Sequence, residues 1–558
     1  MNQIGRTILA IWVTIQVTSA SALSQEVGGA YRQENEWNGN FDRCALVGLG
    51  DLNGDGHGDF AIGAPRGAGN GSFGMVTIRS GFDGSLLNQW VSGFTYDYFG
   101  AAIACAGDVN ADGVNDLIVG ASGSQSKSAF VYSGSDFSLL HHIHEQPGDI
   151  FFGEAVGAAG DVNQDGFDDF IVGAPGSTYW SSTFVGAVYV FSGVDGSLLR
   201  SYSGPHARSR FGCSVAAMQD LNGDGYPEMV IGADHMEIAG MQNAGAASLH
   251  SGKDGALIEQ WHGPNQEYFF ATEVGDAGDM NGDGVHDIVI GSPEANPRNS
   301  ISSGSVSVFS GSDGTLLHQW DGQRMKERLG YSVAGLGDIN QDGFDDLGIG
   351  LPDSGWIYDR NSHVRIYSGG NGALLQQITR GLNKHSFGAS IAGIGDSNGD
   401  GWGDIVIAGS GPKGKSWFGK GAVYLFRFSS LLTANHLTIS ASAGGVLNLD
   451  LHFPDDAGLY SYKVLISTGL GPTHLGVWVP LTFDSLFLQS FTRNYPVHQY
   501  SGMHGTLSFL GNATASMTFP AGMPSSLIGN TYYLAAVANP DQQMAEFCSR
   551  AAALTITP

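Results

Sequence analysis

Clusters of carboxylate and amide side chains recur along this chain at a spacing that suits a divalent cation. In the first cluster, "DLNGDGHGD" (residues 51–59), the oxygen donors fall at alternate positions, namely Asp51, Asn53, Asp55, the backbone carbonyl of His57, and Asp59. Alternate residues of a tight loop direct their oxygens inward, and the glycine at the sixth position, Gly56, permits the sharp turn. Hard oxygen ligands in this number favour Ca²⁺, whose coordination is flexible, over octahedral Mg²⁺. The predicted chemistry of the cluster is therefore calcium binding.

The same pattern of donors occurs seven times, and successive copies begin 53 to 59 residues apart. One such pattern would also fit an ordinary turn rich in Asp and Asn. Seven copies in register predict up to seven bound Ca²⁺ ions. The seventh residue of each copy contributes its carbonyl, and the ligands predicted for the other six sites are Asp108, Asn110, Asp112, Val114 and Asp116; Asp161, Asn163, Asp165, Phe167 and Asp169; Asp220, Asn222, Asp224, Tyr226 and Glu228; Asp279, Asn281, Asp283, Val285 and Asp287; Asp338, Asn340, Asp342, Phe344 and Asp346; Asp396, Asn398, Asp400, Trp402 and Asp404.

The twelfth position of each copy excludes an EF-hand. That motif needs a glutamate there, followed by a helix. Aliphatic residues of a predicted strand stand at this position instead, namely Ile62, Val119, Val172, Ile231, Ile290, Ile349 and Ile407. We expect the acid in the ninth position to close the site.

The elements that must position these loops are short strands. Each repeat opens with an apolar run and continues through the acidic loop to a run such as "DFIVGAP" (169–175). An alternating strand such as "GAVYVFSG" (186–193), a D-G turn and a final strand such as "LLNQW" (86–90) complete it. Four-stranded units at a fixed period predict an all-β, seven-bladed β-propeller.

The ends of the repeat region indicate how the ring closes. The turn and fourth strand occur only six times, because the seventh repeat ends at "AVYLFRF" (422–428). Before the first repeat, "YRQENEWNGNF" (31–41) is similar to "LLNQWVSG". We expect this N-terminal segment to supply the missing outer strand of the seventh blade.

The chain divides into three predicted regions. Residues 1–22 have the features of a secretory signal peptide: Arg6, an apolar run, and small residues before a cleavage site near Ala22. About 10 apolar residues fall short of the ~20 that span a bilayer. Residues 23–429 form the predicted propeller. Residues 430–558 contain short β-type runs between Gly and Pro turns, which predict a small antiparallel β-sandwich-like domain.

Composition limits the classes of partner. A formal net charge of −28 argues against nucleic acid, because phosphate binding needs a basic face. No later segment is long and apolar enough to cross a membrane, so the mature chain is expected to be secreted or held at the cell surface. Four cysteines are too few for a disulfide scaffold. Cys44 and Cys213 are expected to be buried thiols, although a bridge stays open.

The repeats resemble the FG-GAP repeats of the integrin α-subunit propeller over roughly residues 30–430. Phe99-Gly100 carries the first motif and Gly63-Ala64-Pro65 the second, while Gly120-Ala121-Ser122 and Ala408-Gly409-Ser410 are looser matches. The resemblance implies calcium loops on a lower face and ligand contacts on an upper face. Only some integrin blades carry calcium, whereas all seven repeats in this chain have the ligands. A secreted bacterial-type relative without the membrane anchor is expected.

Strand order places the candidate ligand face opposite the acidic loops. The loops between strands 2 and 3 and between strands 4 and 1 emerge there, and loops over a rigid scaffold usually carry binding. Their aromatic residues are Tyr96, Tyr98, Tyr179, Trp180, Trp356, Tyr358, Trp417 and Phe418. Their basic residues are Arg66, Lys127, Arg208, Arg210, Arg298, Arg324, Lys326, Arg328, Arg360, Lys384, Lys413, Lys415 and Lys420.

The function predicted from these features is cell adhesion or extracellular recognition of a protein or glycan. The sequence has no G-x-S-x-G, H-E-x-x-H or P-loop motif, although a pair of carboxylates for glycoside chemistry could lie among its 53 acids. A secreted polysaccharide-acting enzyme and a structural surface or matrix component are the alternatives. "HHIHE" (141–145) occupies a fourth-strand position, which favours a solvated outer strand over a zinc site.

Overall fold

The computed structural model of the 558-residue chain is all-β. It describes residues 29–39, 41, 44–68, 73–123, 127–146, 149–176, 185–297, 300–340, 342–352, 362–379, 386–410 and 421–430, together with the backbone of the strands that follow. None of these residues lies in an α-helix, so the described chain holds no helix that could cross a membrane. The predicted signal peptide, residues 1–22, lies outside the described residues.

Seven four-stranded antiparallel sheets form the first part of the structure, and each corresponds to one repeat. The first three blades are β2 (Ala45–Gly50), β3 (Asp59–Ala68), β4 (Phe73–Arg79) and β5 (Leu86–Thr95); β6 (Ile103–Gly107), β7 (Asp116–Ala121), β8 (Ser128–Tyr132) and β9 (Leu139–His144); β10 (Ala155–Gly160), β11 (Asp169–Ala174), β12 (Ala187–Phe191) and β13 (Leu198–Ser203). The next three are β14 (Ser214–Ala217), β15 (Met229–Ala233), β16 (Ala246–His250) and β17 (Leu257–His262); β18 (Glu273–Gly278), β19 (Asp287–Ser292), β20 (Ser305–Phe309) and β21 (Leu316–Asp321); β22 (Ser332–Gly337), β23 (Asp346–Leu351), β24 (His363–Tyr367) and β25 (Leu374–Thr379). The seventh blade is β26 (Ser390–Gly395), β27 (Asp404–Ser410), β28 (Gly421–Ser430) and β1 (Gly29–Gly39).

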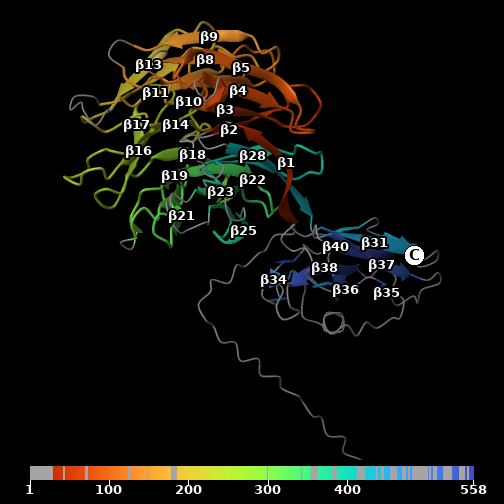
Figure 1. Cartoon of the computed structure of the whole chain (residues 1–558). Coiled ribbons are helices and arrows are strands. Elements are labelled where there is room, and N and C mark those ends of the chain that lie inside the picture. The colour runs from red at the N-terminus through yellow and green to blue at the C-terminus, as the bar shows by residue number, and fades with distance from the viewer. Residues whose placement is uncertain are drawn as a thin grey trace, which may run out of the picture.

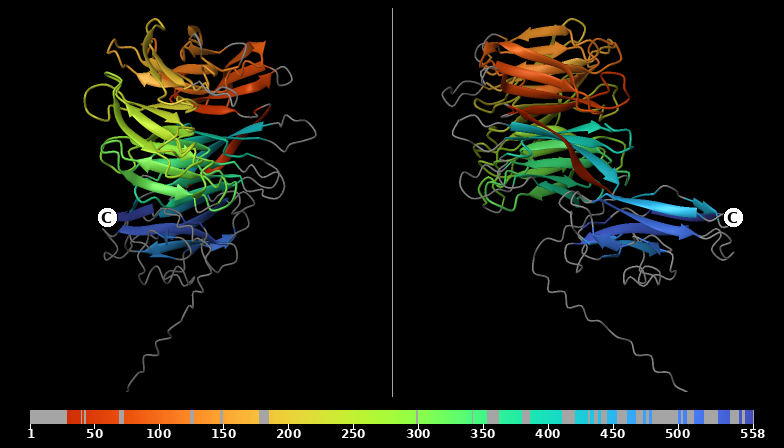
Figure 2. Two further views of the ribbon diagram at one scale, coloured as in Figure 1. Left: turned by 90° about the vertical axis from the view of Figure 1, so that its left-hand side faces the viewer. Right: turned by 45° about the vertical axis from the view of Figure 1, so that its right-hand side comes forward.

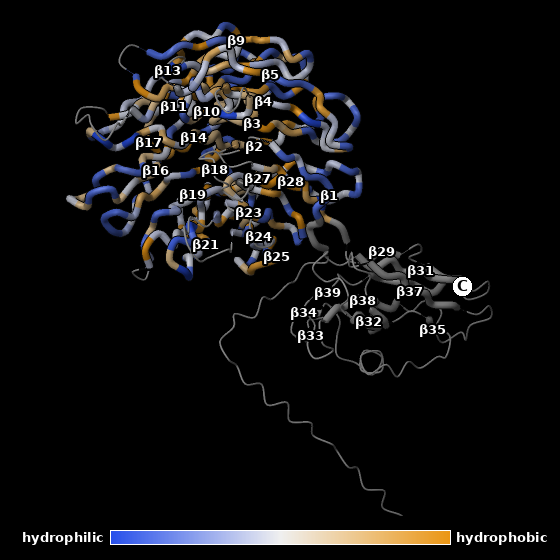
Figure 3. Tube along the Cα trace, in the orientation of Figure 1, coloured by the Kyte–Doolittle hydropathy of each residue, from blue (hydrophilic) through white to orange (hydrophobic). Residues whose placement is uncertain are grey.

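The blades are arranged radially in a closed ring (Figures 1 and 2). The first strand of each blade contacts the first strands of both neighbours, and β26 of the last blade contacts β2 of the first. The second strands are buried along their length, as in β7 and β11, because each lies between two neighbouring blades. Outer strands such as β9 and β13 contain only exposed and partly buried residues, and Figure 3 shows hydrophilic and hydrophobic positions mixed along these strands. The predicted seven-bladed propeller is confirmed.

Contacts between blades explain the Phe-Gly and Gly-Ala-Pro motifs. The Gly100 amide donates to the Gly120 carbonyl of its own blade, at 2.9 Å. Its carbonyl faces Gly63 of the preceding blade so closely that a Cβ on Gly63 would lie 2.3 Å from it. Gly173 stands in the same relation to the Gly212 carbonyl, again at 2.3 Å. The glycines are therefore required where adjacent blades meet backbone to backbone.

The N-terminal strand closes the ring. β1 pairs with β28 from Gly29 opposite Ser430 to Gly39 opposite Gly421, which makes it the outer strand of the seventh blade. Figure 1 shows the red β1 beside the cyan β28. Arg427 of β28 also donates hydrogen bonds to the carbonyls of Gly81 and Phe82 in the first blade. The last blade is thus joined to the first by side-chain contacts as well as by strand pairing.

The strands after Ser430 form separate sheets. They are β29 (Leu432–Ala434), β30 (Thr438–Ser440), β31 (Gly445–His452), β32 (Ser461–Ser467), β33 (Thr473–His474), β34 (Trp478–Val479), β35 (Tyr500–Ser501), β36 (His504–Thr506), β37 (Asn512–Phe519), β38 (Thr531–Asn539), β39 (Phe547–Cys548) and β40 (Ala552–Thr557). One sheet has the order β29-β31-β37-β35, and a larger one contains β30, β40, β38, β32 and β36. Their described pairings are antiparallel, as expected, except that β30 and β40 pair in parallel.

Candidate metal centres

Each acidic loop joins the first and second strands of a blade, on the same face as the turn between strands 3 and 4. In the first blade the ninth-position acid, Asp59, begins β3 and accepts a hydrogen bond from the Gly81 amide of that turn, at 3.1 Å. Asp116 and Gly134 make the same contact in the second blade at 2.9 Å, and Asp169 and Gly193 in the third at 3.0 Å. The acidic loop and the outer hairpin of a blade are therefore held together by one buried carboxylate.

The first-position aspartate organises the backbone of its own loop. Asp51 Oδ1 accepts hydrogen bonds from the amides of Gly54 and Asp55, at 2.7 and 3.1 Å, and Oδ2 accepts one from Gly56, at 2.7 Å. The sixth-position glycines of the seven loops have φ between +85° and +93°, a conformation that disfavours any residue with a Cβ. The loop is thus wound tightly around the first carboxylate, with the third- and fifth-position side chains beside it.

The ninth-position acids lie behind the loops and are almost completely buried. Burial raises the pKa of Asp59, Asp116 and Asp404 to about 6, that of Asp169, Glu228 and Asp287 to about 7, and that of Asp346 to about 8. The neighbouring carboxylates of the loop raise the pKa further in each case. Burying negative charge in this way is costly unless positive charge is supplied.

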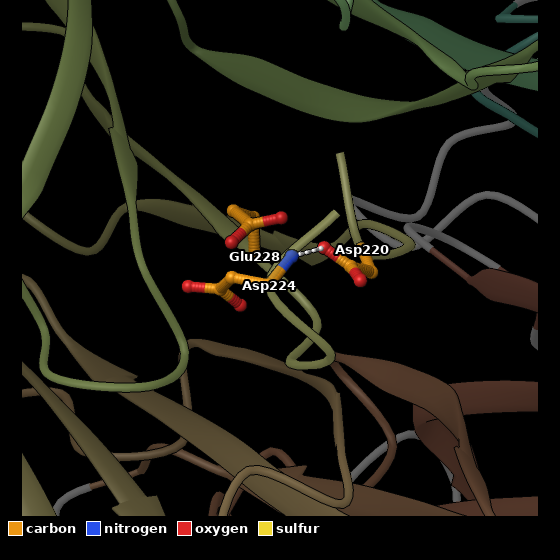
Figure 4. A group of neighbouring side chains, drawn as sticks. All are labelled: Asp220, Asp224 and Glu228. Atoms are coloured by element: carbon orange, nitrogen blue, oxygen red, sulfur yellow. Dashed lines mark hydrogen bonds between the residues drawn. The ribbon is translucent and has the colours of Figure 1, made fainter. Parts of the chain in front are cut away.

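In the fourth loop three carboxylates converge most closely (Figure 4). Oxygen atoms of Asp220, Asp224 and Glu228 all lie within 4.8 Å of one another, and this is the one such group among the described residues. The longer glutamate accepts hydrogen bonds from the Leu221 amide, at 2.7 Å, and from Asn222 Nδ2, at 2.8 Å. The predicted ligands at positions 1, 3, 5 and 9 are therefore neighbours in this loop, and an all-oxygen donor set of this kind fits a hard divalent cation.

In the other six loops the ninth-position aspartate is one methylene shorter, and the described carboxylates do not converge within that distance. Positions 1, 3 and 5 still share one network. Asn53 Oδ1 accepts the Asp55 amide at 2.9 Å, and Asp55 Oδ1 accepts the His57 amide at 2.9 Å. The residues predicted as ligands are thus adjacent, while the ninth acid faces the 3–4 turn.

Contacts between neighbouring loops involve the eighth position, which the spacing of the ligands did not predict. Asp168 Oδ2 accepts a hydrogen bond from the Asp108 amide of the preceding blade at 2.8 Å, and the Asp168 amide donates to the Asp108 carbonyl at 3.2 Å. Asp345 holds Asp279 in the same way, at 2.8 and 3.0 Å. The only signal in the sequence is an Asp-Asp pair at positions 8 and 9 of the third and sixth loops.

We expect Asp168→Ala to loosen the second acidic loop, because it removes the acceptor that holds the first residue of that loop. Hydrogen–deuterium exchange of the peptide spanning residues 108–116 should become at least about tenfold faster, which corresponds to roughly 1.4 kcal/mol of local stability. Asp345→Ala is the matched control, because it should affect residues 279–287 and leave 108–116 unchanged. Equal effects of both variants on both loops would contradict this assignment.

The opposite face carries a turn that is repeated before four of the Phe-Gly motifs or their equivalents, at Phe99, Phe211, Phe270 and Leu329. In this pre-FG turn two residues with left-handed backbone flank a buried one. The flanking residues are Tyr96 and Tyr98, Arg208 and Arg210, Glu267 and Phe269, and Lys326 and Arg328, with φ from +52° to +66°. The buried residues are Asp97, Ser209, Tyr268 and Glu327. A left-handed conformation costs about 1 kcal/mol or more at such residues, so the rest of the structure must impose it.

The predicted aromatic and basic residues of this face divide into two groups. Some are described, and several of these contact neighbouring side chains: Arg66 lies over the Tyr98 ring at 5.6 Å, and Lys127 pairs with Glu145 at 2.6 Å. Arg210 pairs with Asp234 at 2.7 Å and with Glu154 at 2.8 Å. Those outside the described residues are Tyr179, Trp180, Arg298, Trp356, Tyr358, Arg360, Lys384, Lys413, Lys415, Trp417, Phe418 and Lys420.

The histidines of residues 141–144 and three of the four cysteines lie among the residues whose side chains are described. His141–His144 lie in the outer strand β9, where His141 Nε2 contacts the Gly193 carbonyl at 2.6 Å and His142 Nε2 contacts Ser128 Oγ at 3.2 Å. They therefore connect strands and blades. No disulfide joins Cys44, Cys105 or Cys213 among the described residues; Cys44 is buried as expected, whereas Cys213 is only partly buried.

Comparisons with known proteins agree with this architecture. Residues 45–78, 99–134, 152–191 and 272–309 match the family model of the FG-GAP repeat, which places the matches in the first, second, third and fifth blades. The chain is 30% identical to mouse integrin alpha-8 over 297 residues, covering 48% of this chain and 26% of that protein. It is 30% identical to integrin alpha-5 of Xenopus laevis over 213 residues (34% and 19%) and 28% identical to chicken integrin alpha-V over 270 residues (44% and 25%). The chain thus spans about a quarter or less of the length of these relatives.

Proposed function

We propose that this FG-GAP repeat protein is a calcium-binding extracellular recognition protein, which mediates adhesion by binding a protein or glycan ligand. The similarity to integrin alpha chains supports a role in recognition. The acidic loops support calcium binding on one face of the propeller. The loops between strands 2 and 3 and between strands 4 and 1 would carry the ligand on the other face.

Calcium would act as a structural ion in this proposal. In the fourth blade it would be held by Asp220, Asn222, Asp224 and Glu228, with the carbonyl of Tyr226. Its charge would neutralise the clustered carboxylates, and its coordination would fix the hairpin between the first two strands. The protein's own residues already wind the loop and join it to the outer hairpin, so the ion would stabilise an existing geometry. The same argument applies to the six other loops.

The proposed recognition role rests on the pre-FG turn. Its left-handed backbone recurs in four of the repeats, yet its flanking side chains change from Tyr and Tyr to Arg and Arg, Glu and Phe, and Lys and Arg. Left-handed residues other than glycine are costly, and such strain is concentrated at functional positions. A constant scaffold that presents variable side chains is typical of a binding surface.

A screen of extracellular matrix proteins and glycans would test this function. The chain beginning at residue 23 should bind at least one immobilised ligand in millimolar calcium. Substitutions in at least one of the four pre-FG turns, tested turn by turn, should weaken binding, whereas Asp254→Asn on the acidic-loop face should not. Ligand binding that is unchanged by substitutions in every pre-FG turn would contradict the proposal. Release of sugar products from an arrayed polysaccharide would instead favour the enzymatic alternative.

A further inference from the structure

Two large apolar side chains are unusually exposed where the fifth blade leads into the sixth. Met325 is 62% exposed and Ile301 is 59% exposed. They come from different loops, since Ile301 lies between β19 and β20 and Met325 between β21 and β22. The Lys326 amide donates to the Ile301 carbonyl at 2.8 Å, which holds the two loops together. Exposed apolar side chains gathered in this way mark interaction sites more often than isolated ones do.

The surface around Met325 and Ile301 is positively charged, because Glu327, the acid of the pre-FG turn at residues 326–328, points inward. Glu327 Oε1 pairs with Arg365 Nη2 at 2.7 Å, and Oε2 accepts the amides of Gln323 and Arg324 at 2.6 and 3.0 Å. Arg324 and Lys326 are exposed, and no described residue forms an ion pair with either. In a chain of net charge −28, this turn therefore presents two free cations beside two apolar side chains.

The surface is held in one shape before any partner binds. The Arg328 amide donates to the Ser302 carbonyl at 3.1 Å, and the Leu329 amide donates to the Ser303 carbonyl at 3.0 Å. Arg328 is also paired with Glu294 of the other loop. A preorganised surface loses little conformational entropy on binding.

We propose that residues 323–328, together with Ile301, dock an acidic polypeptide segment that carries an aliphatic side chain. The inference rests on the proposed recognition function of this face and adds the chemistry of the partner. Arg324 and Lys326 complement the acids, and Met325 and Ile301 cover the aliphatic side chain. A sulfated glycan would use the cations but would leave both apolar side chains without a partner, so the observations favour the polypeptide.

The test uses the calcium-loaded chain and a short fluorescein-labelled peptide that carries Leu within a run of Glu and Asp. Fluorescence anisotropy should show binding, and the double variant Arg324→Glu/Lys326→Glu should weaken it by about tenfold or more. Met325→Ala should weaken it by about threefold to tenfold, because part of the apolar contact is lost. Replacing Leu by Ser in the peptide should have an effect similar to that of Met325→Ala.

Arg208→Glu is the matched control, because Arg208 occupies the position of Lys326 in the pre-FG turn before the fourth blade. It should change peptide binding by no more than about twofold. Equal losses in Arg208→Glu and the double variant would overturn the proposal, as would binding of heparin fragments without binding of the peptide. No peptide binding combined with a positive ligand screen would reject this site while leaving the proposed function intact.

Discussion

Removing β1 is expected to open the seventh blade. A chain that begins at residue 40 leaves β28 with an unpaired edge, because Gly29–Gly39 supply all the pairing on that side. Hydrogen exchange at the amides of Gly421–Phe428 should become faster, reaching the rate that is set by local unfolding of this blade. Exposed strand edges also promote self-association, so size-exclusion chromatography should show oligomers or aggregates. A chain that begins at residue 23 and keeps β1 is the control.

Trp37→Ala offers a milder version of the same experiment. The Trp37 ring lies 5.5 Å from Phe60, and the Arg79 guanidinium lies 5.1 Å above it, so β1 also contacts the first blade. Truncation of this half-buried ring should lower the free energy of unfolding by about 2 kcal/mol. An intact, monomeric propeller after deletion of residues 29–39 would contradict closure of the ring by β1.

Calcium is expected to stabilise the propeller strongly and specifically. An ion that binds only the folded chain adds about 2.7 kcal/mol per site at a concentration 100 times its dissociation constant. With several sites filled, millimolar calcium should raise the melting temperature by roughly 10 °C or more relative to EDTA. Magnesium at the same concentration should do much less, because the loops offer too many flexible oxygen ligands for octahedral geometry. Near-ultraviolet circular dichroism would follow the transition.

Substitution at the fifth position of one loop gives an internal control for that result. Asp224→Asn in the fourth loop should reduce the calcium-dependent rise by the contribution of one site. Asp254→Asn removes a carboxylate from the 3–4 turn of the same blade, where it accepts the Ala256 amide at 2.9 Å, and should keep the full rise. Identical behaviour of the two variants would mean that the fourth loop holds no stabilising ion.

The sequence predicts the features that depend on local pattern. The repeated spacing from Asp51 to Asp396 predicts the loops, and the alternating runs predict four strands per blade. The missing fourth strand after 422–428 predicts the pairing that β1 makes with β28. These features can be read from the chain because each is set by residues close together in sequence, or by a count of repeats.

The contacts that the sequence does not reveal join distant residues. Asp168 and Asp108 are 60 residues apart, and Arg427 and Gly81 are 346 apart. The inward position of Glu327 depends on Arg365, which belongs to the next blade. The parallel pairing of β30 with β40 likewise joins the two ends of the C-terminal region. No local pattern encodes such contacts, because they arise only when the blades are packed.

Calcium stoichiometry tests the central claim most directly. The chain beginning at residue 23, dialysed against millimolar calcium and then analysed for bound metal, should retain seven Ca²⁺ per chain, one for each acidic loop. Asp224→Asn should retain one fewer, and Asp254→Asn should retain the full number. A chain that holds no more calcium than its EDTA-treated counterpart would contradict the claim.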